Sequence, residues 1–299
     1  MNAMEKLNAM MKQKDSRIVA GLDPEISQLP PAYQTALKNG ILEKNVMMDF
    51  CKKYIDAVAG YVAALKINSA FFEREEFFPI YRQISIYAKV QGLFVIGDLK
   101  RADIGSTSKA YAKAWLGKEQ PFDAITINPY FGTDGVMPFI EVAAENGKGV
   151  FVLAKTSNKS SDEIQNLMMF EPKDYIYERV SDLIVNWGKT VSKGEKYSPV
   201  GAVVGATHPK EAEALRKRMP NTMFLVPGYG AQGASSKDVT VNFDEEGLGA
   251  IVNSSRGLMY AYKKDAYKDI ARTDGWEKAT EVAAFDAKED INQALKAKE

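Results

Sequence analysis

Four charged side chains are spaced in a way that could support catalysis. Lys66 closes an otherwise apolar strand, Asp98 and Lys100 lie at the end of the next run, and Asp103 follows that run. Asp98 and Lys100 are two residues apart, so in an extended strand they project on the same side. Burying isolated charges is costly, but alternating Lys and Asp side chains can remain ionised by pairing. The array could provide acid–base or electrostatic catalysis, whereas the alternative interpretation is a structural salt-bridge network.

A second group of residues could bind an anion. Ser254-Ser255-Arg256-Gly257 follows one apolar run, and the glycine-rich stretch 227–233 follows the run before it. Glycines let the backbone approach an anion closely, and the guanidinium of Arg256 can hold a phosphate through two parallel hydrogen bonds. A tight turn would use the same glycines, and the string is neither a P-loop nor a dinucleotide fingerprint. Arg256 favours the phosphate site, which would face the Lys/Asp array.

The elements that position these residues are predicted from eight short apolar runs. They are continuous rather than alternating, which is typical of parallel strands buried on both faces. Helical spacing lies between them, for example in Val46, Phe50, Tyr54 and Val58, and in 134–146 and 208–219. The runs are Ile18–Asp23, Val62–Asn68, Leu93–Lys100, Ala124–Asn128, Gly149–Thr156, Val200–Ala206, Met223–Pro227 and Gly249–Asn253.

Eight strands joined by helical crossovers predict an α/β fold, a single (β/α)8 TIM barrel that spans residues 1–299 as one domain. Catalytic groups of such barrels lie at the C-terminal ends of the strands, where the polar residues above fall. We expect added helices between strands five and six, in Asn158–Pro199, and at the C-terminus. The tail from Trp276 onward is either a surface helix packed on the barrel or a frayed end.

Composition excludes several classes of protein. The 299 residues contain 39 basic and 39 acidic side chains, so net charge gives no indication of a nucleic-acid or anionic-membrane partner. The one cysteine and one histidine cannot build a Cys/His zinc site, and we expect Cys51 in the core and His208 at a helix entry. We find neither a signal peptide nor an apolar stretch long enough to span a bilayer, and we expect a cytoplasmic protein.

The strings at the strand ends resemble those of orotidine 5'-monophosphate decarboxylases, in particular the longer bacterial branch (type 2) and the protozoan parasite enzymes. The resemblance runs in order from about residue 18 to 260, and its most specific string begins at Asp98. Two mild departures are Ala102, where glycine is common, and Lys155, where arginine is common. The strings are Gly21-Leu22-Asp23-Pro24, Ala64–Asn68, Gly97–Thr107, Asn128-Pro129-Tyr130, Thr156-Ser157-Asn158, Val226–Gly233 and Asn253–Gly257.

The resemblance implies a role for each matching residue. Lys66, Asp98, Lys100 and Asp103 would form the catalytic array, with Lys100 as the proton donor. Asp23 and Lys66 would contact the ribose hydroxyls. Asp103, Ile104 and Thr107 would reach into the neighbouring subunit's site, which implies a homodimer. The other substrate-binding residues would be Ser157 on the pyrimidine, Gln232 between ring and phosphate, Pro227 beside them, and Arg256, Gly230 and Gly257 on the phosphate.

The implied reaction is the last step of de novo pyrimidine nucleotide synthesis, decarboxylation of orotidine 5'-monophosphate to uridine 5'-monophosphate and CO2. It leaves negative charge at ring carbon 6, where no ordinary electron sink exists. Most decarboxylases use a cofactor or metal as that sink, but here the resemblance implies neither. The Lys100 ammonium would stabilise the charge and then protonate carbon 6, while Asp98 would either crowd the substrate carboxylate or hold Lys100 in place. The stretch 228–238 would be a mobile lid.

Three other interpretations of the chain remain. A metal-dependent sugar-phosphate lyase of the same barrel superfamily has a similar Asp-x-Lys-x-x-Asp string, but it holds magnesium partly through an acid on the second strand, where Lys66 stands here. A non-catalytic nucleotide-binding barrel would have no need for the costly array. The third interpretation, that the chain is half of a fused bifunctional enzyme, is not supported by its length.

Overall fold

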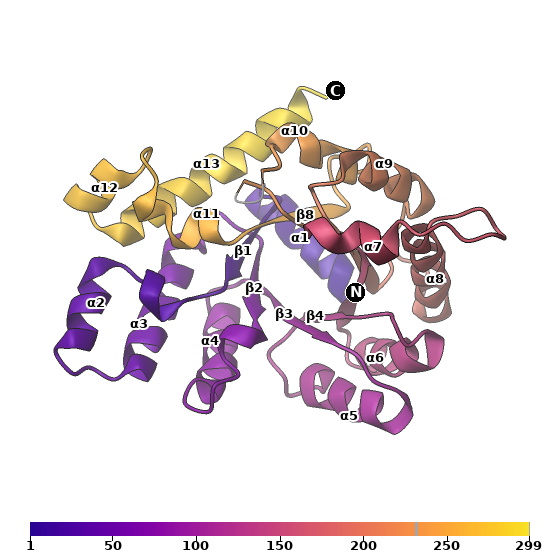
Figure 1. The fold of residues 1–299 in the computed structure, drawn as a ribbon, viewed down its shortest axis with the longest axis horizontal. Coiled ribbons are helices and arrows are strands. Elements are labelled where there is room, and N and C mark those ends of the chain that lie inside the picture. The colour runs from indigo at the N-terminus through magenta and orange to yellow at the C-terminus, as the bar shows by residue number, and fades with distance from the viewer. Residues whose placement is uncertain (231–232, 299) are drawn as a thin grey trace.

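The eight predicted strands form a closed parallel barrel in a computed structural model that describes residues 1–230 and 233–298. Each strand pairs with its neighbours in chain order, and β1 closes the barrel against β8 (Figure 1). The predicted barrel is therefore confirmed: six predicted runs contain their strands, and β3 and β8 each extend one residue beyond their runs, to Arg101 and Ser254. The strands are β1 (Ile18–Leu22), β2 (Ala64–Asn68), β3 (Phe94–Arg101), β4 (Ala124–Ile127), β5 (Gly149–Lys155), β6 (Val200–Val204), β7 (Phe224–Pro227) and β8 (Ala250–Ser254).

Helices surround the barrel and connect successive strands (Figure 1). The outer layer contains α2 (Pro31–Lys38), α3 (Glu43–Val58), α4 (Phe78–Val90), α5 (Gly105–Leu116), α6 (Thr133–Glu145), α8 (Ile176–Val191), α9 (Pro209–Arg218) and α13 (Trp276–Lys296). Shorter helices are α7 (Asp162–Gln165), α10 (Ser236–Val239), α11 (Arg256–Met259) and α12 (Lys268–Thr273). Single 3-10 turns are η1 (Ile26–Gln28), η2 (Ser69–Phe71), η3 (Lys159–Ser161), η4 (Thr240–Asn242) and η5 (Ala261–Lys263).

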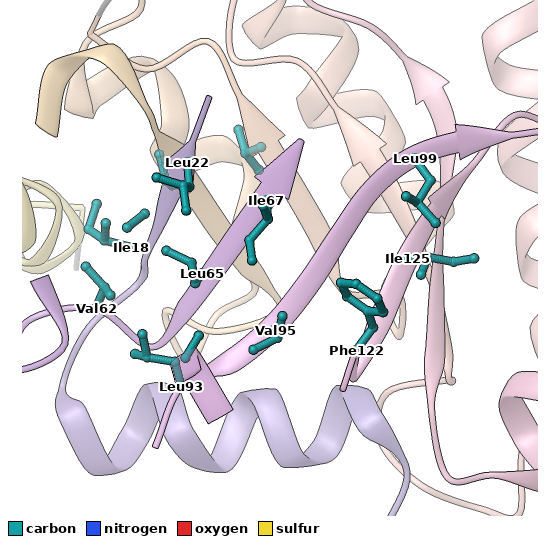
Figure 2. Close-up of a cluster of buried hydrophobic side chains, with 14 of the residues drawn as sticks. Ile18, Leu22, Val62, Leu65, Ile67, Leu93, Val95, Leu99, Phe122 and Ile125 are labelled. Atoms are coloured by element: carbon teal, nitrogen blue, oxygen red, sulfur yellow. The ribbon is translucent and has the colours of Figure 1, made fainter. Parts of the chain in front are cut away.

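The larger hydrophobic core lies between the barrel and its helices. Strand residues such as Leu65, Ile67 and Val95 belong to it (Figure 2). The helical residues Phe50 and Tyr54 belong to the same core. All five side chains are fully buried, because the outward face of each strand is covered by a helix. Cys51 lies in the same core, as predicted.

The barrel interior forms a second, separate core. Ala64, Ile96 and Ala124 contribute to it, and two residues further along the same strands Lys66, Asp98 and Thr126 line a pocket. Side chains of a strand alternate between its two faces, so each strand supplies apolar residues to the barrel floor and polar residues to its C-terminal end. The site therefore stands on a packed apolar base.

An N-terminal helix, α1 (Ala3–Lys14), closes the barrel at the N-terminal ends of the strands and lies behind them in Figure 1. Met4, Leu7 and Met11 are fully buried on it and pack into the interior core with Val19 and Phe94. Its side chains cover the N-terminal ends of the strands, opposite the polar layer. The sequence analysis assigned no structure to this segment.

Both predicted additions are helical. The segment between β5 and β6 forms η3, α7 and α8, and α8 packs against both of these strands. The C-terminal segment forms α13, which packs against α3 and buries Trp276 and Ile291, so the packed surface helix is the correct alternative. No helix within residues 1–230 and 233–298 combines the length and the apolar character needed to cross a membrane.

Candidate active site

A cavity of about 480 Å³ opens at the C-terminal ends of the strands, within the volume range of small-molecule sites. Its wall includes most of the predicted site residues that the structure describes, from six strands and the loops that follow them. The predicted residues that line it are Asp23, Lys66, Asp98, Lys100, Ser157, Pro227 and Arg256. The barrel thus brings together side chains that are far apart in the sequence.

Asp98 is the centre of the charge array. Its Oδ2 lies 2.8 Å from Lys66 Nζ, and its Oδ1 lies 2.6 Å from Lys100 Nζ. Asp23 Oδ1 lies 3.6 Å from Lys66 Nζ on the other side. The side chains of Lys66 and Asp98 are 7% and 9% exposed, whereas that of Lys100 is 49% exposed. Both lysines line the cavity, and Lys100 is the more exposed of the two.

Pairing keeps the buried members of the array ionised. Burial alone would lower the pKa of Lys66, but the carboxylates of Asp23 and Asp98 outweigh it and hold that pKa above its ordinary value. Burial alone would raise the pKa of Asp98, but the ammonium groups of Lys66 and Lys100 outweigh it and hold that pKa far below its ordinary value. At neutral pH the centre of the array is a carboxylate between two cations.

Thr126 on β4 contacts both Asp98 and Lys100 of β3. Its hydroxyl donates to Asp98 Oδ1 at 2.9 Å and accepts the backbone N–H of Lys100 at 2.9 Å. Lys100 has a left-handed backbone with φ of 48°, which is unfavourable for a residue with a Cβ. The register between β3 and β4 shifts between Gly97 and Arg101. Thr126 and Asp98 therefore hold Lys100 from its backbone and from its side chain.

The segment after β5 is held by buried polar contacts. Lys155, which is fully buried, donates through Nζ to Ser161, Asp162 and Asn166 at 2.8–2.9 Å. Gln165 on α7 accepts the N–H of Thr156 at 2.9 Å and donates to its hydroxyl at 2.7 Å. The added helix thus fixes the backbone that carries Ser157.

Gly205 lets this segment approach β6. A Cβ at that position would lie 2.8 Å from both the N and the Cα of Ser157, closer than real Cβ contacts. A side chain there would displace Ser157 from the wall of the cavity. Glycine is therefore required after β6 for a contact made by the loop after β5.

The loops after β7 and β8 border another part of the cavity. Gly228, Tyr229, Ser255 and Arg256 line it there. Gly21 lets β1 approach this part, because a Cβ would meet Ser255 Oγ at 1.8 Å. An exposed guanidinium beside glycine-rich backbone is suited to a phosphate.

The remaining predicted phosphate residues are placed differently. Gly257 is buried in α11, where a Cβ would meet Ser254 Oγ at 2.9 Å and Lys264 Nζ at 3.4 Å. Gly230 is exposed with φ of 69°, a conformation that favours glycine. Gln232 falls outside the described residues.

Asp103, Ile104 and Thr107 lie away from the cavity of their own chain. They stand at the start of α5, where the Asp103 carboxylate accepts the N–H of Ile104 at 2.8 Å. Ile104 is 54% exposed. A single chain therefore brings together Lys66, Asp98 and Lys100 but not the fourth predicted member of the array.

Two buried acceptors beside the cavity are left without a hydrogen-bond donor in the described structure. They are Asp23 Oδ1 and Asn253 Oδ1. Buried polar atoms are nearly always paired, so these oxygens are positioned to accept hydrogen bonds from a bound molecule. Asn253 belongs to a quoted string, but the sequence analysis gave it no role.

Several other wall residues had no individual role in the sequence analysis. For those within strands, the signal that could have found them is alternation, which places every second residue inside the barrel. The strand residues are Asn68, Thr126, Leu153, Val203, Leu225 and Asn253. Thr156 and Asn158 belong to a quoted string, and Gly228, Tyr229 and Ser255 belong to the predicted anion-binding segments. His208 caps α9 and its Nε2 lies 3.3 Å from Ser161 Oγ, so its predicted place at a helix entry is confirmed.

Comparison with known proteins assigns the family. The sequence model described as "Orotidine 5'-phosphate decarboxylase / HUMPS family" matches residues 16–270. The chain is 40% identical to orotidine 5'-phosphate decarboxylase of Caldicellulosiruptor bescii over a 312-residue alignment that covers 99% of each chain. It is 39% identical to that of Rhodopirellula baltica, covering 96% of this chain and 97% of the relative.

A solved structure agrees with these relatives. The structure of Leishmania donovani OMP decarboxylase superposes with a TM-score of 0.76 at 30% identity, covering 99% of each chain. The matched fold, the matched sequence and the strings at the strand ends all agree. This chain therefore belongs to the orotidine 5'-phosphate decarboxylase / HUMPS family.

Proposed function

We propose that this protein decarboxylates orotidine 5'-monophosphate to uridine 5'-monophosphate and CO2, the last step of de novo pyrimidine nucleotide synthesis. The observation that carries the proposal is the cavity itself, whose wall contains both the Lys66–Asp98–Lys100 array and Arg256. The match to relatives of this name over nearly the whole chain supports the same reaction.

The cavity offers a partner for each part of a pyrimidine nucleotide. Arg256 and the backbone around Gly228 would hold the phosphate, and Ser157 would hydrogen-bond the ring. Asp23 Oδ1 forms an ion pair with Lys66 but no hydrogen bond within the described residues, so it could accept one from a ribose hydroxyl. Ring and phosphate would thus be fixed at the two ends, with the sugar between them. Pro227, Gly230, Gln232 and Gly257 complete the substrate-binding set that we propose.

The chemistry that we propose has two steps. The bond between ring carbon 6 and the carboxylate carbon breaks, its electron pair stays on carbon 6, and CO2 leaves. The ammonium of Lys100 stabilises this carbanion and transfers a proton to carbon 6, after which the amine regains a proton from solvent. The 49% exposure of Lys100 supports its assignment, because this ammonium is the more accessible of the two.

Asp98 orients the proton donor in this proposal. Its carboxylate lies 2.6 Å from Lys100 Nζ and is itself held by Lys66 and Thr126. This contact holds the ammonium of Lys100 in place for both steps. The same Asp98 carboxylate would face the substrate carboxylate and repel it. Its position would therefore both orient Lys100 and crowd the substrate.

We propose a homodimer in which Asp103, Ile104 and Thr107 enter the partner's site. Support comes from an exposed apolar surface beside them, formed by Ile104, Tyr130 and Phe131, which are 54%, 81% and 47% exposed. Phe131 lies against this corner, because a Cβ at Gly135 would meet both Phe131 Cβ and the backbone oxygen of Asp103 at 2.7–2.8 Å. Exposed apolar patches of this kind mark protein–protein contacts.

The test is the turnover of orotidine 5'-monophosphate by metal-stripped protein with chelator present, followed by ultraviolet absorbance. Rapid formation of uridine 5'-monophosphate is the expected result. Activity that appears only with added magnesium and a sugar phosphate would assign the protein to the metal-dependent relatives. Nucleotide binding without turnover under either condition would favour a non-catalytic barrel.

A further inference from the structure

The C-terminal helix α13 contacts the loop that follows β7. Asp290 on α13 accepts two hydrogen bonds from that loop, from Tyr229 Oη at 2.6 Å and from Ser236 Oγ at 2.9 Å. Tyr229 lies within the glycine-rich stretch 227–233, and Ser236 follows that stretch. One carboxylate on a distant element therefore joins both ends of the loop.

The anchored ends belong to the phosphate side of the cavity. Tyr229 lines the cavity beside Gly228 and Arg256, so the residue whose hydroxyl reaches Asp290 also borders the proposed ligand. Ser236 is the first residue of α10, and α10 packs against α13. Burial, together with the Asp290 carboxylate, raises the pKa of Tyr229, so its hydroxyl remains a donor at neutral pH.

The ends of the loop are also paired with each other. The N–H of Gly230 donates to the oxygen of Ala234 at 2.8 Å, and Tyr229 and Ala234 form an isolated bridge. Ser235 starts α10 with a capping box that it shares with Asp238. The described parts of the loop are therefore a compact unit, whose connection to the scaffold includes Asp290.

We propose that Asp290 is a positioning residue for phosphate binding: by holding Tyr229 and Ser236, it fixes the loop after β7 in the orientation that grips the phosphate of the nucleotide. This inference rests on the proposed function and gives α13 a role in it. A loop held in its binding conformation loses less conformational freedom when the ligand binds. Binding energy from the phosphate would then be available for the reaction at the far end of the substrate.

The test compares substrates with and without the phosphate. We expect Asp290→Ala to lower kcat/KM for orotidine 5'-monophosphate roughly five- to tenfold, since about 1 kcal/mol for a hydrogen bond corresponds to about fivefold. For orotidine, which has no phosphate, kcat/KM should stay within about twofold of wild type. Tyr229→Phe should lower kcat/KM less in the Asp290→Ala background than in the wild type, because the contact between the two residues is already lost there. The two effects should therefore be non-additive.

Asp286→Ala is the matched control. Asp286 stands one turn earlier on α13 and accepts a hydrogen bond from Tyr267 at 3.0 Å, an equivalent Tyr–Asp contact away from the loop. Its loss should leave both substrates unaffected. Equal losses with both substrates in Asp290→Ala would instead indicate a purely structural role, and unchanged or tighter nucleotide binding would also overturn the proposal.

A binding measurement separates this proposal from the proposed reaction. Calorimetry with uridine 5'-monophosphate and with uridine needs no turnover, and Asp290→Ala should weaken the nucleotide roughly five- to tenfold while uridine is unchanged. Wild-type protein that binds the nucleotide but does not decarboxylate its precursor would contradict the proposed function alone. Equal binding of the nucleotide by wild type and Asp290→Ala would contradict the role of Asp290 alone.

Discussion

At the scale of single residues, the site depends on how one lysine is held. Lys100 has a left-handed backbone, its N–H donates to Thr126, and its ammonium meets Asp98. Strain of this kind, of order 1–3 kcal/mol, persists only where surrounding contacts impose it. The predicted pairing of Asp98 with Lys100 was correct, but the sequence analysis did not identify Thr126. A lone threonine in an apolar strand has no distinguishing motif, although its place two residues after Ala124 indicates an inward side chain.

Thr126 provides the first prediction. Thr126→Val removes the donor to Asp98 and leaves the N–H of Lys100 without its acceptor, at a cost of about 1–3 kcal/mol. We expect kcat to fall about 10- to 100-fold with little change in KM. Thr126→Ser keeps the hydroxyl and should retain most of the activity. Steady-state kinetics of the two variants checks this, and equal losses in both would show that retaining the hydroxyl does not preserve activity, against the role given to it here.

The pH dependence of stability provides the second. The pKa of Asp98 is held below its unfolded value, so its pairing stabilises the folded protein above about pH 4 and is lost as the pH falls through the folded-state pKa. The stability advantage of wild type over Asp98→Asn should therefore be constant near neutral pH and shrink below about pH 4. Urea unfolding of both proteins from pH 7 to pH 3 measures it. A difference that stayed constant down to pH 3 would contradict the paired carboxylate.

At the scale of elements, the strands were predictable and the closing helix was not. Continuous apolar runs predict buried parallel strands because both faces of each strand are covered, which the structure confirms for all eight. The segment 3–14 mixes lysines with methionines, and its apolar side chains become a distinct face only against the barrel floor. Tertiary packing rather than local propensity determines such a helix.

Helix α1 provides the third prediction. Leu7 is fully buried in the interior core, so Leu7→Ala should lower the free energy of unfolding by about 2–4 kcal/mol. Turnover per folded molecule should stay close to wild type, because the cavity lies at the opposite end of the barrel. The exposed Lys12→Ala on the same helix is the control and should change stability by less than about 0.5 kcal/mol. Denaturant unfolding measures both, and a Leu7→Ala protein as stable as the control would show that α1 does not pack as described.

At the scale of the whole molecule, the incomplete array in one chain is the main feature. Lys66, Asp98 and Lys100 meet within the barrel, while Asp103 stands outside at the start of α5. The sequence string Asp98–Asp103 shows the spacing of these residues but not the fold of the turn between them. Only the resemblance implied that Asp103 acts on another subunit, and the exposed Ile104, Tyr130 and Phe131 support that proposal.

The dimer provides the fourth prediction. Asp103→Ala and Lys100→Ala proteins should each be nearly inactive, because each lacks one part of every site. When the two variants are mixed and exchange subunits, a dimer with one subunit of each variant has both defects in one site and neither defect in the other. Activity should return to about a quarter of wild type, since about half of the dimers are mixed and have one intact site each. A mixture that stayed as inactive as its parents would place Asp103 in the site of its own chain.

The central claim is that Lys100 delivers the proton that completes decarboxylation. The most direct measurement compares orotidine 5'-monophosphate turnover by wild type and Lys100→Ala, with chelator present, alongside calorimetric binding of uridine 5'-monophosphate. Our account predicts that turnover falls by many orders of magnitude while the product still binds, because Arg256 and the loop after β7 are unchanged. Near-normal turnover by Lys100→Ala would contradict the assignment of the proton donor and the mechanism built on it.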